Sequence, residues 1–283
     1  MSKRNSILAG SWYPASKENL LKEIESLFLG EFGPGKLPRL GNYNDNLVAL
    51  ISPHAGYVYS GQAAAWSYYE LAKHGPRDLV VIIGPNHSGI GSGISASSFR
   101  KWETPLGSLE VDLDFSKELA KNFESLDFDD VAHAREHSIE IQLPFLQYIY
   151  GSSFKIVPIS IWLYDLNLSI KLGESIAKTI KDCDKKAVII ASSDMTHYMP
   201  KEVAETRDKN TLDAILSLDE FKTWKVASEL ESLCGLAPVI SAMKAAKVLG
   251  AKKAEVLKYY TSGDVTGEKD AVVGYGSVAF KKS

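Results

Sequence analysis

Three segments of this sequence repeat one pattern, in which a short apolar run ends in small or turn-forming residues and a histidine follows. They read LVALISPHAGY at 47–57, DLVVIIGPNH at 78–87 and AVIIASSDMTH at 187–197. Short apolar runs bounded by turn residues are typical of strands buried on both faces of a parallel sheet, although a buried helix segment can have the same composition.

The histidine of each segment lies just beyond the expected carboxyl end of a strand. Pro53 cannot continue a central strand, so the chain should leave the sheet there and present His54 at its edge. His87 and His197 occupy equivalent positions after the other two runs. Because ligands of open α/β sheets bind outside the carboxyl ends of the strands, we expect the three histidines to share one crevice.

The composition limits the class of protein. Helical and strand patterns alternate along all 283 residues without an obvious linker, which predicts a single α/β domain over residues 1–283. A net charge of -3 gives no reason to expect nucleic acid or an anionic membrane as a partner. Two cysteines cannot build a disulfide framework, and the sequence shows neither a signal peptide nor a run of about 18 apolar residues, so we predict a soluble, cytoplasmic protein.

Several further elements are predicted from periodicity and capping residues. Ser16 should cap a first helix whose apolar residues fall on one face, and Asp219 should cap a later one. Pro158 suggests that the strand at 154–161 lies at an edge or near a terminus of the sheet. We also expect a loop at 30–46, helices at 62–73, 166–181, within 201–232 and from Cys234 to about Gly250, and closing strands at 255–261 and 271–280.

The segment between His87 and the next expected helix is rich in glycine and serine up to Ser98. Either Asp112 or Asp114 should cap the helix that follows. A long irregular segment beside the crevice often carries substrate contacts, but a plain hairpin fits the same residues equally well.

His133 and His137 are four residues apart, a spacing that would place both on one face of a helix and allow them to bind a metal. Pro144 makes the helical register uncertain, and the segment is not a His-Glu-x-x-His motif. His137 alone, as an acid–base or orienting group, is the better interpretation.

Neutral imidazoles from neighbouring strand ends can hold a transition metal, which then needs a third ligand. Cys234 is a candidate because the start of a helix lowers the pKa of a thiol and favours the metal-binding thiolate. A small buried core residue is the alternative. Cys183 lies at a helix end between two aspartates and should be structural.

Asp194 and His197 lie three apart, so the carboxylate could orient the imidazole or bind metal itself. Ser192 and Ser193 also allow a serine nucleophile, but no Gly-x-Ser-x-Gly elbow, phosphate loop or dinucleotide fingerprint is present. We therefore rank a hydrolase below a metalloprotein. A metal-dependent hydrolase would need zinc and an activated water.

Six motifs in order resemble the Memo family, whose founding member is a mediator of ErbB2-driven cell motility. They run nearly from end to end of the chain and are AGSWYP at 9–14, SPHAGY at 52–57, GPNH at 84–87, EHSIE at 136–140, SSDMTH at 192–197 and Cys234-Gly235. The family is similar in fold to class III extradiol ring-cleaving dioxygenases. The resemblance implies a three-layer α/β/α fold with a largely parallel central sheet.

The resemblance also implies a metal centre. It makes His54, His87 and Cys234 the ligands of iron(II) or copper, with zinc less suitable, and places Asp194, His197 and His137 in or near the same pocket. The dioxygenases use a carboxylate where this sequence has Cys234. A thiolate is softer and more easily oxidised, which favours copper(I) or a redox role over conventional ring cleavage.

Two functions remain open on this basis. The first is redox chemistry on an unknown small molecule, with His197 or His137 as acid–base group. The second is a non-catalytic module that binds a partner protein or a phosphotyrosine-containing peptide, as the resemblance implies. Aromatic residues at positions 12, 13, 57, 59 and 102 would line its pocket. The alternative is that these aromatic residues belong to the core. From the resemblance alone, a radical-SAM protein and an Ammecr-type protein are expected as partners.

Overall fold

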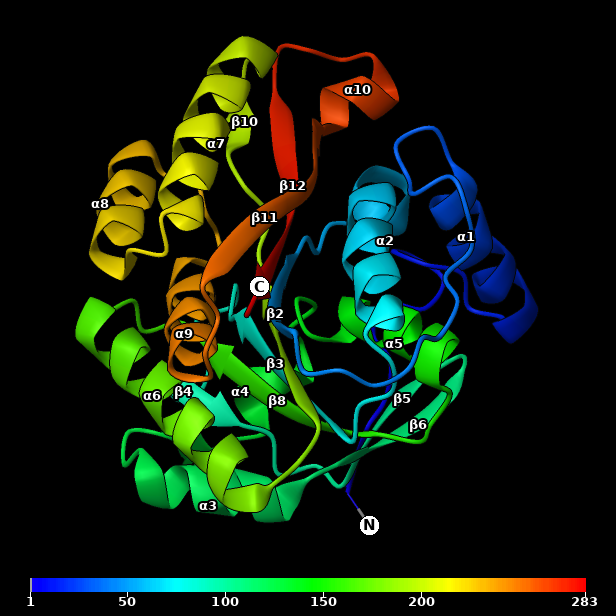
Figure 1. The fold of residues 1–283 in the computed structure, drawn as a ribbon. Coiled ribbons are helices and arrows are strands. Elements are labelled where there is room, and N and C mark those ends of the chain that lie inside the picture. The colour runs from blue at the N-terminus through cyan, green and yellow to red at the C-terminus, as the bar shows by residue number, and fades with distance from the viewer. Residues whose placement is uncertain (1) are drawn as a thin grey trace.

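The computed structural model describes residues 2–283 as one large sheet with helices on both faces (Figure 1). The sheet has twelve strands, and β3 (Leu79–Pro85) lies near its middle. The main path runs in the order β1 (Lys3–Arg4), β5 (Lys101–Thr104), β6 (Gly107–Val111), β8 (Lys155–Ile161), β3, β9 (Ala187–Ser192), β2 (Leu47–Ser52), β12 (Val272–Lys281) and β10 (His197–Met199).

The five central strands, from β6 to β2, are parallel to one another. Val81 at the centre of β3 lies opposite Val157 on one side and Ile189 on the other. The strand β12 then runs antiparallel to β2 and also pairs with β11 (Lys253–Thr261). The largely parallel sheet is thus confirmed. Because β2, β3 and β9 point the same way, their carboxyl ends meet at one edge.

The helices form the two outer layers of an α/β/α arrangement. One layer contains α1 (Lys17–Leu29), α2 (Tyr57–Lys73) and α5 (Leu143–Tyr150), and the other contains α3 (Leu113–Asn122), α6 (Leu166–Cys183), α7 (Lys201–Leu216), α8 (Glu220–Leu230) and α9 (Leu236–Val248). Short elements complete the fold: β4 (Ile94–Ala96), β7 (Asp127–Phe128), α4 (Val131–Ala134), the 3-10 helix η1 (Glu140–Gln142) and α10 (Ser262–Thr266). Within residues 2–283, no helix combines the length and apolar character that a bilayer crossing requires.

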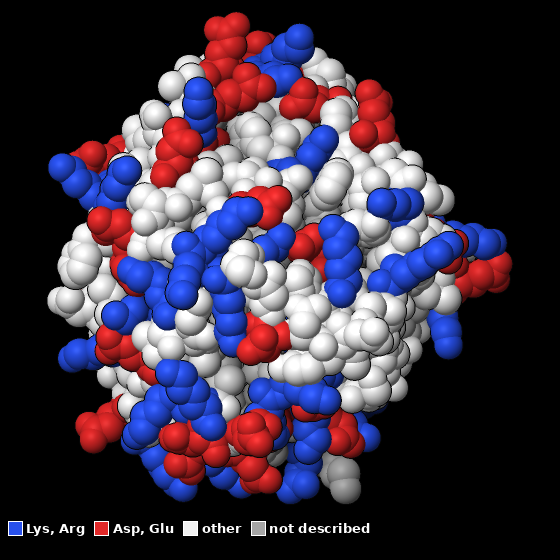
Figure 2. Space-filling view, in the orientation of Figure 1, with Lys and Arg blue, Asp and Glu red and all other residues white. Residues whose placement is uncertain are grey.

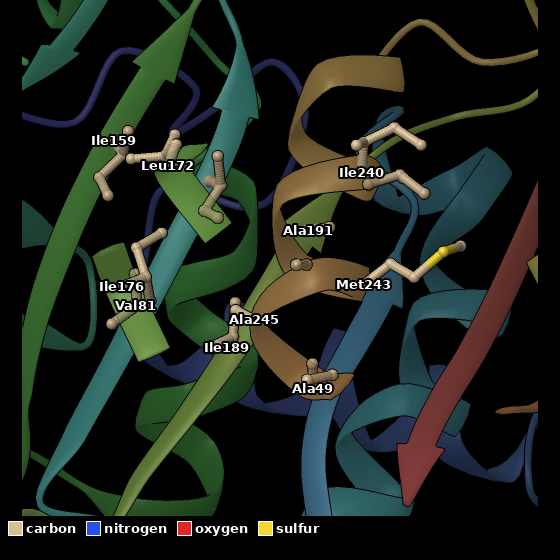
Figure 3. Packing of buried hydrophobic residues seen from close by; sticks show 14 of the residues in the cluster. Ala49, Val81, Ile159, Leu172, Ile176, Ile189, Ala191, Ile240, Met243 and Ala245 are labelled. Carbon is tan, nitrogen blue, oxygen red and sulfur yellow. The ribbon is translucent and has the colours of Figure 1, made fainter. Parts of the chain in front are cut away.

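Alternation along the strands supplies two hydrophobic cores, one on each face of the sheet. In β3, Val81 and Ile83 face α6 and α9, whereas Val80 and Ile82 face α1, α2 and α5. Figure 3 shows the first core, where Leu172 and Ile176 of α6 lie against the strands. All these strand residues are fully buried, which explains why each strand reads as a continuous apolar run.

The predicted caps of α1 and α8 are confirmed. The side chains of Ser16 and Asp219 accept the expected hydrogen bonds from Asn19 N and Lys222 N. Of the two candidates for α3, Asp112 is the cap, because its side chain accepts from Phe115 N. The loop at 30–46 contains no helix or strand.

One expectation needs correction, and one open alternative is decided. The strand β8 is not at an edge, because it pairs with β3 on one side and with β6 and β4 on the other. Pro158 is tolerated because it lies between the last residue paired with β6, Ile156, and the first paired with β4, Ile159. The segment after Ser98 forms the β5–β6 hairpin, as in the plainer of the two interpretations.

Candidate metal centre

Three histidines converge at the carboxyl edge of the sheet. His54 follows β2, His87 follows β3, and His137 lies in the loop between α4 and η1. One ring nitrogen from each lies within 4.8 Å of the corresponding atom of the other two, a spacing from which the group could hold a metal ion. The rings of His87 and His137 are stacked with their centroids 4.4 Å apart.

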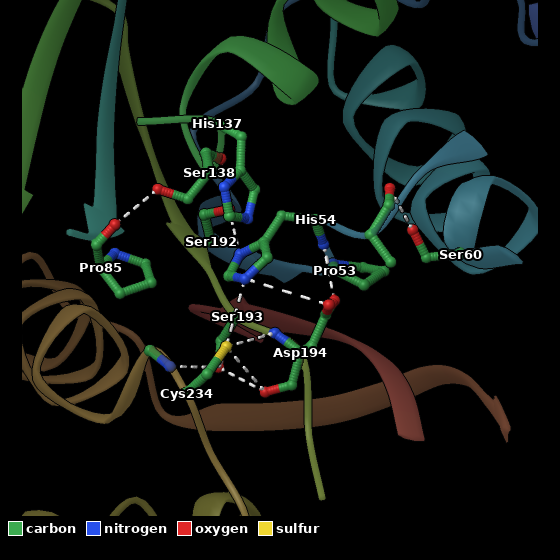
Figure 4. Close-up of polar contacts among 12 residues, drawn as sticks. Pro53, His54, Ser60, Pro85, His137, Ser138, Ser192, Ser193, Asp194 and Cys234 are labelled. Atoms are coloured by element: carbon green, nitrogen blue, oxygen red, sulfur yellow. Dashed lines mark hydrogen bonds and ion pairs between the residues drawn. The ribbon is translucent and has the colours of Figure 1, made fainter. Parts of the chain in front are cut away.

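Ser192, the last residue of β9, fixes the tautomer of His54. Its hydroxyl donates its single proton to Ser138 O at 2.6 Å and accepts from Gln142 Nε2 at 2.9 Å. His54 Nδ1, which lies 2.9 Å from the same oxygen, must therefore carry the proton and donate it. The lone pair of His54 Nε2 is left for a metal or another donor (Figure 4).

Glu136 fixes His87 in the same way. Its carboxylate accepts from His87 Nδ1 at 3.0 Å and from the backbone N–H groups of His87, His137 and Ser138. Burial by itself would raise the pKa of Glu136, but the hydrogen bond and charge of His87 outweigh it and lower the pKa to about 2. An ionised carboxylate holding Nδ1–H directs His87 Nε2 towards the centre.

Two of the imidazoles at the centre, those of His54 and His137, are held neutral. Burial, together with the neighbouring His137 and His87, depresses the pKa of His54 well below its usual value. Burial also lowers the pKa of His137 to about 4, despite the opposing charge of Glu136. Metal ligation requires neutral imidazole, so these donors fit a transition metal without first losing a proton.

Cys234 lies beside His54, just before α9. Its Sγ is 3.2 Å from His54 Nε2 and accepts a hydrogen bond from Asp194 N at 3.2 Å. The expected lowering of its pKa is wrong for the metal-free protein: burial, and then the Asp194 carboxylate, raise the pKa of the thiol. The helix start does not compensate, because the sulfur lies in a buried site next to a negative charge. The protonated thiol can donate to the bare His54 Nε2.

Asp194 and His197 lie in the same pocket. Asp194 accepts from His54 N at 2.7 Å, and its Oδ2 lies 4.0 Å from His54 Nε2. Burial raises its pKa to about 6. His197 Nδ1 lies 2.8 Å from Met195 O, to which it donates, so its Nε2 is the nitrogen left for other partners. The expected sharing of one crevice by His54, His87 and His197 is confirmed, although His137 is the one that joins the close group.

A cavity of about 610 Å³ opens above these residues. Its floor is formed by His54, His87, His137, Asp194 and His197, and its other walls by Trp12, Ala55, Tyr59, Tyr198, Ser262, Thr266, Glu268, Ala271, Val273 and Tyr275. The ring of Trp12 lies 4.5 Å from that of His137, measured between centroids. The volume suits a small-molecule ligand.

The aromatic residues proposed for a binding pocket fall into two groups. Trp12 and Tyr59 line the cavity as expected. Tyr13, Tyr57 and Trp102 are buried in the second core and do not line it. Tyr13 instead contacts Glu140, and Trp102 contacts Arg4. Glu140 and Arg4 form a buried pair.

His133 and His137 do not form a metal pair. The helix α4 ends at Ala134, so the two side chains are not on one helical face, and His133 lies fully buried against Ser95 and Trp102. The serine-nucleophile interpretation also fails at Ser192, because this hydroxyl is fully buried and its proton is donated to a backbone carbonyl. Cys183 packs at the edge of the first core, away from the site.

Sequence reasoning missed the supporting residues. Glu136 and Ser192 determine which nitrogens of His87 and His54 face the centre, and Gln142 supports Ser192. Because Glu136 directly precedes His137 in the sequence, a supporting carboxylate near the histidines could have been predicted. Nothing in the sequence indicated that Glu268 lines the cavity.

The comparisons with known proteins agree with this architecture. The family model described as "Memo-like protein" matches residues 4–279. A MEMO1 family protein of Methanopyrus kandleri is 42% identical over 280 residues, covering 99% of both chains, and one of Methanocaldococcus jannaschii is 45% identical over 277 residues, covering 95% of this chain and 96% of its own.

Among solved structures, the fold is similar to that of an uncharacterized protein from Escherichia coli K12. The TM-score is 0.57 at 14% identity, with 82% of this chain and 99% of that chain covered, so the likeness concerns the fold alone. The match over nearly all of the sequence, together with the strand-end histidines and Cys234, leads to one conclusion. The chain belongs to the Memo family.

Proposed function

We propose that this protein is a non-haem metalloprotein that binds iron or copper and carries out redox chemistry on a small molecule. The observation that supports it most directly is the convergence of three ring nitrogens from His54, His87 and His137, with the Nδ1 atoms of His54 and His87 held from behind. Bound iron or copper would supply one-electron chemistry, which zinc cannot.

For the third ligand we propose Cys234, with His137 as the competing donor. The distance of 3.2 Å between Cys234 Sγ and His54 Nε2 suits two ligands of one ion, given bonds of about 2.3 Å to sulfur and about 2.0 Å to nitrogen. The thiol proton that His54 now accepts would have to leave when a metal binds. His137 would then be free to exchange protons with a bound molecule, together with His197 and Asp194.

Elemental analysis of protein purified without oxygen or chelator tests the metal site. His54→Ala should remove stoichiometric iron or copper, and Cys234→Ser should lower it at least tenfold, while both variants stay folded. His74→Ala and Cys183→Ser are matched controls away from the cavity and should retain the metal. Full metal retention by His54→Ala would refute the proposal.

Proton release identifies the third ligand. Calorimetric titration of the metal in buffers of different ionisation enthalpy should show about one more proton released per metal from the unaltered protein than from Cys234→Ala if the Cys234 thiol binds, because the thiol is protonated before metal binds. Equal proton release from the two proteins, with metal lost in His137→Gln, would assign the third position to His137.

A binding module without turnover is the second candidate, supported by the aromatic walls of the cavity. Trp12, Tyr59, Tyr198 and Tyr275 all contribute to its lining. A phosphotyrosine peptide, however, would find no lysine or arginine among the lining residues. Titration of such a peptide with and without metal separates the candidates, because tight metal-independent binding would favour the module.

A further inference from the structure

The mouth of the cavity differs in character from its floor. Tyr59 from α2 and Tyr198 from β10 are 43% and 76% exposed, yet both line the cavity. Tyr198 has a φ of +57°, an uncommon backbone conformation for a non-glycine residue, and the pairing of β10 with β12 is irregular at this point. Two partly exposed aromatic side chains therefore line the same cavity as the histidines.

The charged residues that line the cavity are all acidic or histidine. Asp194 lies at the floor and Glu268 at the mouth, and the lining contains no lysine or arginine. The segment around Glu268 contains two further acidic residues, Asp264 and Asp270, and one lysine, Lys269, which directly follows Glu268. Figure 2 shows acidic side chains, with some basic ones among them, at the top of the view, where Figure 1 places α7 and α10.

Glu268 is also free to contact a ligand. It is exposed, and no ion pair involving its carboxylate occurs in residues 2–283. Its neighbour Asp264 is different, because it is bound to Lys201 and to the backbone of Thr261. A carboxylate without an ion pair that lines the same cavity as two aromatic residues is a combination that can recognise organic cations, since ring faces attract positive charge and the carboxylate neutralises it.

We propose that the cavity selects a small molecule whose outer end is cationic, such as a primary or substituted amine. The cation lies between the rings of Tyr59 and Tyr198 and the carboxylate of Glu268, while the inner end of the molecule faces the histidines. A molecule with an anionic outer end is rejected, because it meets Glu268 without any lysine or arginine to balance it. The inference extends the proposed function by naming the class of substrate.

Three probes with one ring and one short chain test this selectivity: 2-phenylethylamine, 2-phenylethanol and 3-phenylpropanoate. Calorimetric titration into metal-free and zinc-loaded protein should give at least tenfold tighter binding of the amine than of the carboxylate. The alcohol should fall between them. Equal affinities for amine and carboxylate, or no binding of the amine at about 10 mM, would overturn the inference.

Substitutions at the mouth identify the group responsible. Glu268→Gln should reduce the preference for the amine severalfold, and Glu268→Lys should reverse it, with metal content unchanged in both because Glu268 is not one of the grouped donors. Asp270→Lys makes the same charge change on the same segment outside the cavity lining and should leave most of the preference intact. An equal effect of Asp270→Lys and Glu268→Lys would show a general surface field and overturn the role of Glu268.

The two proposals fail separately. Protein that binds no metal but still prefers the amine would refute the metalloprotein and retain the selectivity of the mouth. Protein that binds stoichiometric iron or copper yet shows no preference among the probes would do the opposite.

Discussion

At the scale of single residues, the hydroxyl of Ser192 controls which nitrogen of His54 is available. It can donate only one proton, and that proton goes to Ser138 O, so its remaining role towards His54 is that of an acceptor. An imidazole held by Nδ1 presents Nε2 to the cavity. The nitrogen that His54 presents to the cavity thus depends on a residue of another strand.

Replacing Ser192 by alanine should therefore weaken metal binding without unfolding the protein. We expect a loss of about 10- to 100-fold in affinity for added metal, as is typical when the group behind a ligand is removed. Competition with a chelator measures the affinity, and ¹⁵N chemical shifts of the histidine ring report the tautomer of His54.

Ser160→Ala is the matched control for this experiment. Ser160 is equally buried near the end of β8, and its hydroxyl has no partner among the residues that the structure describes. It should leave affinity and tautomer unchanged. A normal metal affinity in Ser192→Ala would show that Ser192 does not set the state of His54.

The sequence could predict some of these residues and not others. His54 and His87 follow apolar runs, so the strand pattern located them at one edge. His137 lies in an irregular loop, where no periodicity indicates which way its side chain points. The protonation of Cys234 was also out of reach, because the burial that raises its pKa is a property of the assembled fold.

At the scale of elements, the N-terminal segment is fastened to the loop that carries His137. Glu140 accepts hydrogen bonds from Ser6, from the backbone of Ile7 and Leu8, and from Tyr13. Its other partner is Arg4, which also donates to the carbonyl oxygens of the loop at residues 133 and 136. The same segment places Trp12 against His137.

Breaking the buried pair of Arg4 and Glu140 should lower the free energy of unfolding. Glu140→Gln places an amide where an ionised acceptor is needed and leaves the buried Arg4 without a counter-charge, so we expect a loss of about 3–5 kcal/mol in the free energy of unfolding. Urea denaturation measures it. Glu103→Gln, which breaks the exposed pair with Lys3, should cost about 0.5 kcal/mol or less. Similar costs for both variants would contradict the argument.

Predictions of elements succeeded where the signal was local. The caps at Ser16, Asp112 and Asp219 depend on one side chain and the next turn of backbone. The position of β8 within the sheet does not depend on local residues alone, because Pro158 is accommodated by two other strands that meet beside it. Pairing between distant strands leaves little trace in a single sequence.

At the scale of the whole molecule, a buried neutral histidine links stability to pH. Burial, together with the charge of Arg4, lowers the pKa of His133 to about 4, whereas the unfolded chain has a value near 6.5. Between these two values the unfolded state binds more protons, so acid favours unfolding. The stability is complete above about pH 6.5 and falls as the pH drops towards 4.

His133→Gln should flatten this dependence. Between pH 7 and pH 4.5, the unaltered protein should lose on the order of 2 kcal/mol more stability than the variant. Urea midpoints at several pH values give both slopes, and any constant cost of the substitution cancels in the comparison. Parallel slopes would show that His133 does not remain neutral in the folded protein.

The general architecture was the most predictable level. Alternating apolar runs and helical patterns indicated an α/β fold, and the six motifs indicated a three-layer arrangement with a largely parallel sheet, as the structure shows. The mouth of the cavity was not predictable, because Tyr59, Tyr198 and Glu268 come from three distant segments. Only the assembled sheet brings them together.

The pairing of β2 with β12 also has a consequence for biosynthesis. The strand that leads to His54 is made early, but its antiparallel neighbour is the last strand of the sheet to leave the ribosome. Until then β2 has one unpaired edge, and the cavity lacks Val273 and Tyr275. A nascent chain therefore holds its histidines in an unfinished pocket until the last strand has been made.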